Sequence, residues 1–226
     1  MYKRQVVLVD TSIVSVDGDK KTIRIGSRRS KLERVELAPL LAHELLVHAQ
    51  RCINAQKIDD EILRSPLAGY EQAEEGLGVY VEWIFSGTLP QKMKDRYIDI
   101  ALALGMNKKF GRFKRTELFE FALQRAQVRA SANEENITPA QLMKKVWTHV
   151  DRIFRGTPGD DSEGVFTRDT VYYAGFIKMR RYISRQYRAG RSAPRIWRYL
   201  SAAKFDPTNH IHVDYLNEKT GKNLDF

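Results

Sequence analysis

The stretch LAHELLVHAQR, residues 41–51, places His43, Glu44 and His48 in an apolar background. A zinc-peptidase helix normally spaces such histidines four residues apart, as H-E-x-x-H, whereas here they are five apart. Each residue of an α-helix turns by about 100°, so positions five apart lie nearly opposite one another. An inserted residue in a π-type bulge returns them to one face. The sequence therefore leaves two structures open: a straight helix with two unrelated histidines, or a bulged helix that carries a metal site.

A carboxylate for such a site is available in EQAEEGLG, residues 71–78, which offers Glu71, Glu74 and Glu75. Gly76 and Gly78 each cost a helix about 1 kcal/mol relative to alanine, and close approach of a neighbouring helix is a reason to keep them. Such an approach would bring a carboxylate to the histidines. A solvated acidic face is the competing interpretation.

The composition is that of a globular protein, with 42% hydrophobic and 29% charged residues among 226. No stretch approaches the 18 or so apolar residues of a transmembrane helix, so we expect no membrane association. The apolar run at the N-terminus is broken by Asp10 and Asp17, which favours a strand over a signal peptide. Cys52 is the only cysteine, so no intrachain disulfide can form. This fits a cytoplasmic location.

The residue pattern predicts a mostly α fold with a small N-terminal β element, an α+β class, in one domain over residues 1–226. The β-branched runs 5–9 and 12–16, the turn DGDK at 17–20 and the alternating TIRIG at 22–26 indicate a hairpin or small meander within about residues 1–30. Helical periodicity follows at 33–54, with Pro39 as a possible first residue. Further helices are expected at about 67–85, 92–105, 115–130, 139–155, 167–189 and 193–205, before a weakly patterned tail at 210–226.

The chain is strongly basic, with a net charge of +10 and a pI of about 9.7. Many cationic residues fall within 178–198. A solvated basic face, an acidic protein substrate and nucleic acid all fit this charge. The sequence has no zinc-finger spacing, aromatic RNA-binding motif or Gly-rich phosphate loop, so nucleic acid is the less favoured partner.

Two ordered blocks resemble the family of microtubule-associated tyrosine carboxypeptidase and its bacterial relatives named for a Q-E-G-L-A motif. The first is HELLVH with Arg51 and Asn54, followed some thirty residues later by AEEGLG. The second, RIFRGTPGDDSEGVFTRDTVYYAGF at 152–176, is similar to R-x-x-R-G followed by G-x-F-[ST]-K-D-x-x-Y-x-x-G. This chain departs from the family pattern at Leu46 (usually Gly), Ala73, Gly78 (usually Ala) and Arg168 (usually Lys). Family members are also usually longer on the N-terminal side, so the chain is a minimal member or a fragment.

The resemblance implies a zincin-like metallopeptidase core with one Zn²⁺ held by His43, His48 and Glu75. Glu44 would act as general base on a zinc-activated water, and Tyr172 would stabilise the oxyanion. It implies a metallocarboxypeptidase that removes a C-terminal residue from a protein or peptide, and the charge of the chain favours an acidic tail. The candidates for binding the substrate carboxylate are Arg152, Arg155, Arg168 and Arg51, of which Arg51 could instead brace the site. The alternatives are a non-catalytic zinc-binding regulatory module and, less favoured, a basic nucleic-acid-binding protein.

Overall fold

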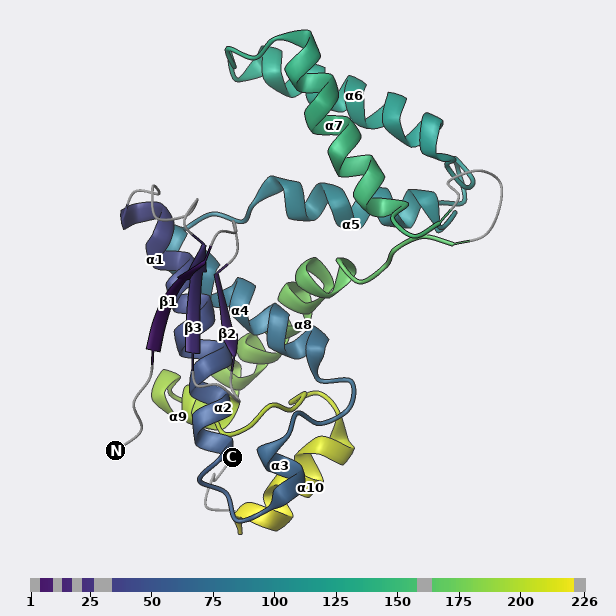
Figure 1. The fold of residues 1–226 in the computed structure, drawn as a ribbon. Helices are drawn as coiled ribbons and strands as arrows, with labels where there is room; N and C mark the ends of the chain where they lie inside the picture. Colours follow the sequence, from purple (N-terminus) through teal and green to yellow (C-terminus); the bar gives the residue numbers. More distant parts are fainter. Residues whose placement is uncertain (1–4, 10–13, 18–21, 27–33, 158–163, 222–226) are drawn as a thin grey trace. The chain divides into compact units, whose positions relative to one another are not determined.

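The computed structural model describes residues 5–9, 14–17, 22–26, 34–157 and 164–221 (Figure 1). Helices dominate this part of the chain, as expected, and none of them combines the length and hydropathy needed to span a bilayer. In chain order the helical elements are α1 (Arg34–Ala42), the π-helical η1 (His43–Ala49), α2 (Gln50–Ala55), α3 (Glu61–Arg64), α4 (Glu71–Ser86), α5 (Gln91–Ala103), α6 (Arg115–Ala132), α7 (Pro139–Ile153), α8 (Thr170–Arg188), α9 (Ala193–Leu200) and α10 (His210–Thr220).

Three short strands precede the helices: β1 (Gln5–Val9), β2 (Val14–Asp17) and β3 (Thr22–Gly26). β3 lies between the other two, antiparallel to β2 and parallel to β1. The pairing of β2 with β3 matches the expected hairpin. The meander alternative is wrong, because β1 pairs with β3 and not with its neighbour in sequence. Residues 18–20 of the expected turn lie outside the described residues.

The helical stretch from Arg34 to Ala55 is continuous through its π-helical middle, since Ala42 and Gln50 both have right-handed helical dihedral angles. The expectation that the helix begins at Pro39 is wrong, because Pro39 lies inside α1. An interior proline removes one backbone hydrogen bond and crowds the carbonyl four residues earlier, yet the helix continues through Pro39. The result is one long support for the histidines.

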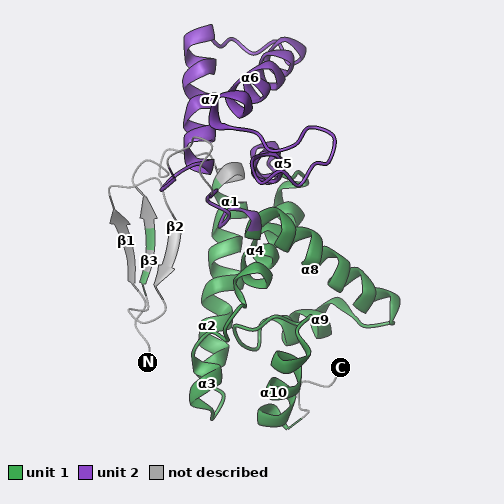
Figure 2. Ribbon diagram, turned by 90° about the vertical axis from the view of Figure 1, so that its right-hand side faces the viewer, with its two compact units in different colours: residues 1–89, 171–226 green, residues 90–170 purple. Residues whose placement is uncertain are grey.

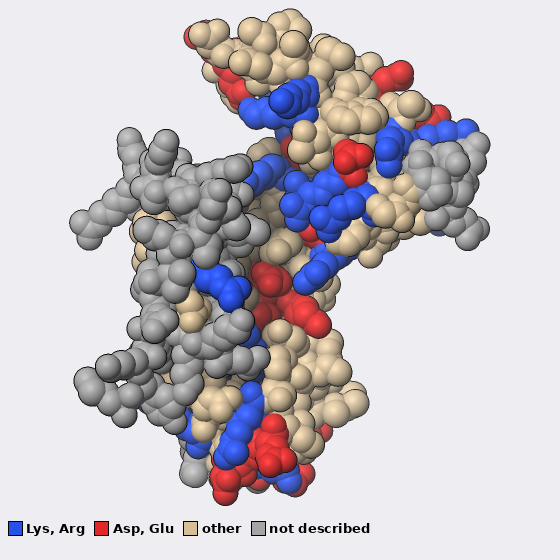
Figure 3. Space-filling view, in the orientation of Figure 1, with Lys and Arg blue, Asp and Glu red and all other residues tan. Residues whose placement is uncertain are grey.

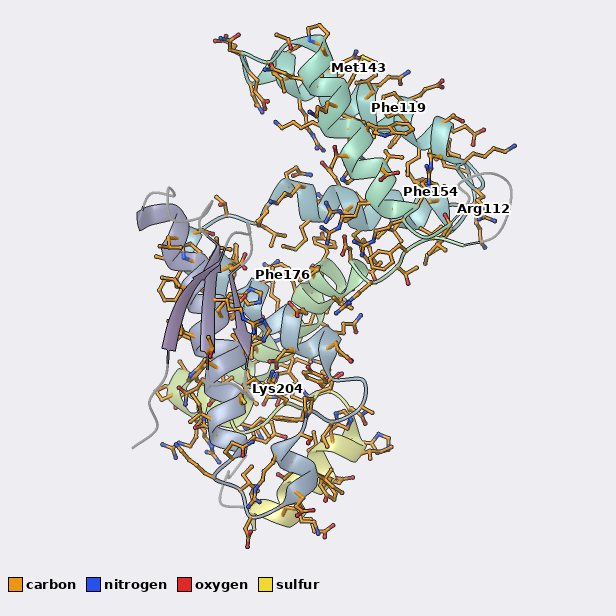
Figure 4. All side chains as sticks on the ribbon, viewed as in Figure 1. Arg112, Phe119, Met143, Phe154, Phe176 and Lys204 are labelled. Atoms are coloured by element: carbon orange, nitrogen blue, oxygen red, sulfur yellow. The ribbon has the colours of Figure 1, made fainter. Side chains whose placement is uncertain are left out.

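The described chain forms two compact units, residues 1–89 with 171–226, and residues 90–170 (Figure 2). Unit 1 holds the long N-terminal helix, α4 and the C-terminal helices around a core that includes Val47, Leu77 and Phe205. Unit 2 consists of α5, α6 and α7 around Leu118, Val150 and Phe154; Figure 4 labels Phe154 at the end of α7. The single domain expected over 1–226 stays a prediction.

Two helices were missed by the sequence interpretation, α3 and α10. α10 buries only His212 and Leu216, which is too small an apolar stripe to show as helical periodicity. Its start is fixed by Asn209, whose side chain accepts a hydrogen bond from the Ile211 amide at 3.0 Å, a typical N-cap. α4 begins later than expected, because Gly69 has a left-handed φ of 81° in the turn before it.

α4 and α8 cross in backbone contact at Gly76 and Gly175. A Cβ on Gly76 would lie 2.1 Å from the carbonyl carbon of Gly175, and one on Gly175 would lie 2.1 Å from the carbonyl oxygen of Gln72. No side chain fits between the two helices here. The cost of Gly76 within a helix is therefore explained by close helix packing, although its neighbour here is α8 and not the helix that carries the histidines.

Gly76→Ala should destabilise the protein by about 1–3 kcal/mol, because the added methyl forces two backbones apart and this outweighs the gain in helix propensity. Chemical denaturation followed by circular dichroism measures the change. Glu71→Gln, at an exposed position of the same helix, should shift stability by less than about 0.5 kcal/mol. A Gly76→Ala protein at least as stable as the parent would contradict the packing argument.

Candidate metal centre

The π-helical segment brings the two histidines together. His43 Nε2 lies 2.9 Å from His48 Nε2, and the two ring centroids are 4.8 Å apart. Residues His43–Ala49 form the π-helix. The bulge predicted from the five-residue spacing is thus confirmed, and the straight-helix alternative is excluded.

The Nδ1 atom of each ring, which points away from the other ring, is hydrogen-bonded to a carboxylate. His43 Nδ1 donates to Glu82 Oε1 at 2.6 Å, and His48 Nδ1 donates to Glu74 Oε1 at 2.8 Å. An ionised carboxylate can only accept, so the proton of each neutral imidazole lies on Nδ1. Both Nε2 atoms then carry lone pairs that face each other. Two lone pairs at this separation repel unless a proton or another cation lies between them.

Two further carboxylates reach the same point. Glu75 Oε2 lies 3.6 Å from His43 Nε2 and 4.0 Å from His48 Nε2. The ligand atoms of His43, Glu44 and His48 all lie within 4.8 Å of one another. Ligand atoms bonded to one tetrahedral zinc at 2.0–2.2 Å lie roughly 3.3 Å from one another. The distances of 2.9, 3.6 and 4.0 Å between the His43, His48 and Glu75 atoms bracket this value. His43, Glu44 and His48 therefore form a group that could hold a metal ion, with Glu75 beside it.

The electrostatics of this group favour bound positive charge. Burial would lower the pKa of His43, but hydrogen bonds to Glu75 and Glu82 outweigh it and raise that pKa to about 10. Burial raises the pKa of Glu44. Burial acts in the same direction on Glu75, but the hydrogen bond from His43 outweighs it and lowers the pKa of Glu75. The pKa values of these two neighbouring carboxyl groups are thus shifted in opposite directions.

A buried ion pair supports His48 from behind. Glu74 is 2% exposed and Arg51 is 1% exposed, and the Arg51 guanidinium donates to Glu74 Oε2. Lys204, labelled in Figure 4, places its Nζ 3.4 Å from Glu74 Oε1. Burial would raise the pKa of Glu74, but the Arg51 charge lowers it to about 2. Glu74 therefore stays ionised and keeps His48 in the tautomer that presents Nε2.

Arg51, one of the candidates for binding the substrate carboxylate, is held within the protein, and a role in substrate binding stays a prediction. Its remaining donors reach backbone carbonyls, from Nε to Ala203 at 2.7 Å and from the second terminal nitrogen to Phe205 at 2.6 Å. The donors of this guanidinium are thus directed at groups of the protein itself. Arg51 thereby ties the metal-site helix to the segment after α9, which is the bracing role left open by its place three residues after His48.

Gly78 explains how α4 approaches the histidines. A Cβ at this position would lie 2.3 Å from His43 Nε2, so glycine lets the imidazole lie against the helix backbone. Glu75 and Glu82 lie three residues before and four residues after it, on the same helical face. The roles of Glu74 and Glu82 as partners of Nδ1 were missed. Glu82 could have been found, because it lies seven residues after Glu75 and so on the same helical face. Glu74 lies next to Glu75 on another face, and its contact with His48 depends on how the helices cross.

The other predicted site residues are not brought to this group by any described contact. Tyr172 lies half-buried on α8 in unit 1. Three arginines belong to unit 2: Arg152 donates to Asp169 at 2.6 and 2.9 Å, the Arg155 guanidinium lies 4.3 Å from the centre of the Phe166 ring, and Arg168 is exposed. A role for these four residues at the metal stays a prediction.

Comparison with known proteins does not place the chain in a family. No family model matches it, and no curated protein matches it. The resemblance to the tyrosine carboxypeptidase family therefore rests on the residues of its two motif blocks.

Glu82→Gln should lower zinc affinity by about 10- to 100-fold, the usual effect of losing a carboxylate that orients a ligating histidine. Competition with a chromophoric chelator measures the affinity. Glu71→Gln makes the same charge change at an exposed position of α4 and should leave zinc affinity unchanged. Equal losses in both variants would mean that general charge, and not the contact with His43, controls binding.

Zinc binding at pH 7 should release about one proton. Because the pKa of His43 is raised to about 10, the zinc-free protein holds this proton throughout the neutral range, and it leaves only as pH rises through that value. Zinc requires the neutral imidazole and displaces the proton. Calorimetry in buffers with different ionisation enthalpies counts the released protons. Binding at pH 7 without proton release would contradict the raised pKa of His43.

Proposed function

We propose that the protein is a zinc-dependent peptidase of the metallocarboxypeptidase type, related to the family that its motifs resemble. One observation carries the proposal: two Nε2 lone pairs and a Glu75 oxygen converge on one point, with Glu44 beside them. Two histidines and one carboxylate leave a fourth zinc position open, which is the catalytic pattern. A metal site with a purely structural role has no need of the additional, half-buried Glu44.

The opposite pKa shifts of the two carboxylates support a division of roles. Glu75, with its pKa lowered, would remain anionic and serve as the third ligand beside His43 and His48. Glu44, with its pKa raised by burial, would act as the general base. Environments that separate the pKa values of two neighbouring carboxyl groups are typical of acid–base pairs in active sites.

Bound zinc would supply Lewis acidity, which makes water a stronger acid and polarises a peptide carbonyl. Glu44 would take a proton from the attacking water and later give it to the leaving amine. Glu82 and Glu74 would keep both imidazoles in the ligating tautomer. Tyr172 would donate a hydrogen bond to the developing oxyanion, a role assigned to it through the family resemblance alone.

The substrate we propose is a protein or peptide with an acidic C-terminal tail. A net charge of +10 attracts such a tail from solution. A free C-terminal carboxylate suits an arginine, which binds it through two parallel hydrogen bonds. Arg168 and Arg155 are exposed and remain the proposed partners, whereas Arg152 already pairs with Asp169. The single cysteine supports a cytoplasmic setting as part of this proposal.

Glu44→Gln should retain about one zinc per chain and lose cleavage by at least about 10²-fold, since loss of a general base commonly costs 10²–10⁴. The assay uses protein purified without a histidine tag and peptides with acidic tails, monitored by mass spectrometry. Amidated versions of the same peptides should resist cleavage if a free carboxylate is recognised.

Matched controls separate the possible outcomes. Glu71→Gln removes one negative charge from an exposed site and should cleave at the parental rate. Zinc bound by the parent protein without cleavage of any peptide would instead support a non-catalytic zinc-binding module. Parent protein that lacks zinc at near one-to-one stoichiometry would remove both assignments.

A further inference from the structure

Unit 2 contains a pocket that has no part in the proposed peptidase chemistry. It has a volume of about 410 Å³ and is formed by α5, α6 and α7. Figure 3 shows Lys and Arg side chains gathered over α5 and α7. Six cationic residues line the pocket: Lys92, Arg96, Arg125, Arg129, Lys145 and Arg152.

The cations follow a regular pattern in the sequence. Lys92 and Arg96 lie four residues apart on α5, as do Arg125 and Arg129 on α6, and Lys145 and Arg152 lie seven apart on α7. Residues four or seven apart share one face of a helix. Each of the three helices therefore presents a row of cationic side chains to the same pocket. A surface that is basic only because of the net charge would not concentrate its cations in this way.

Largely buried carboxylates hold the arginines in place. Each of three aspartates pairs with two basic groups: Asp95 with Arg125 and Arg129, Asp99 with Arg125 and His149, and Asp169 with Arg96 and Arg152. Asp99 is fully buried and accepts from Arg125 at 2.8 and 2.5 Å. Fixed guanidinium planes lower the entropic cost of binding a ligand, so these cations are preorganised.

The pocket carries a surplus of positive charge. Asp95 and Glu135 line it together with the six lysines and arginines, and Asp99 and Asp169 pair with its arginines, which leaves two positive charges unbalanced. Lys92 and Lys145 are exposed and form no ion pair with another residue in the described ranges. A concave surface focuses this field, and an anion would neutralise it.

The floor of the pocket is apolar, lined by Ala122, Ala126, Leu142 and Val146. A ligand that fits both surfaces therefore has an apolar body and an anionic group. The volume lies within the roughly 300–1,000 Å³ of small-molecule sites. Cations on three sides favour a tetrahedral group with oxygens in several directions over a planar carboxylate with two.

We propose that this pocket in unit 2 binds a small organic phosphate, with the phosphate among the α5, α6 and α7 cations and the apolar body against the alanine-lined floor. The site is independent of the metal centre in unit 1. It holds its ligand whether or not zinc is bound.

The test uses the full chain and 1-naphthyl phosphate, which joins an apolar ring to a phosphate. Titration calorimetry should show one site per chain, with binding at least tenfold tighter than that of inorganic phosphate or 1-naphthol. Binding should be the same in zinc-loaded and zinc-free protein, which separates this result from failure of the peptidase proposal. 1-Naphthoate bound as tightly as the phosphate would overturn the ligand class.

Two double variants decide whether the pocket is responsible. Lys92→Gln/Lys145→Gln removes two exposed pocket cations and should weaken 1-naphthyl phosphate at least tenfold. Lys94→Gln/Lys144→Gln removes the same charge from exposed positions of the same helices outside the pocket and should change the affinity less than twofold. Thermal unfolding checks that both fold. Equal weakening in the two variants, or no binding by the parent, would overturn the proposal.

Discussion

Two imidazole nitrogens held 2.9 Å apart impose the constraint on which the candidate metal centre depends. Because Glu82 and Glu74 occupy the outer nitrogens, the inner ones face each other as lone pairs and require a positive charge between them. A proton on one of the two nitrogens meets this requirement, which agrees with the raised pKa of His43. A divalent cation would also satisfy it, since the Glu75 carboxylate lies 3.6 Å from His43 Nε2 and adds negative charge at the same point.

The backbone of the long helix is distorted to create that constraint, and its neighbours keep it distorted. π-helical turns are rare and are found frequently at functional sites. Local backbone strain persists only where the surroundings over-determine it. Here Val47 is fully buried within the π segment, Gly78 lets α4 contact His43, and Arg51 ties the following turn to the carbonyls of Ala203 and Phe205. Contacts on three sides thus fix the one arrangement in which both histidines share a face.

The sequence predicts this centre well where the chemistry is local, and less well where it depends on tertiary pairing. The spacing of His43 and His48 requires the bulge, and the paired glycines of α4 indicate a close helix approach. Arg51 could not be assigned in the same way, because the same residue can brace or bind, and only its burial beside Glu74 decides. The helix α10 was missed since two buried residues leave almost no periodic pattern. The order of the strands depends on pairing across the sheet, which hairpin patterns do not encode.

The net charge of the chain does not show which cationic side chains are paired and which are available for a ligand. In the basic stretch 178–198, Lys178 pairs with Asp206 and the Arg180 guanidinium lies 5.5 Å from the centre of the Trp83 ring, so part of that charge is used in packing. In unit 2, buried aspartates neutralise most of the arginine charge but leave a surplus in one hollow. The candidate sites of the two units therefore attract charges of opposite sign. The histidine group of unit 1 could hold a cation, whereas the pocket of unit 2 is lined by an excess of cationic residues, and a total of +10 describes neither.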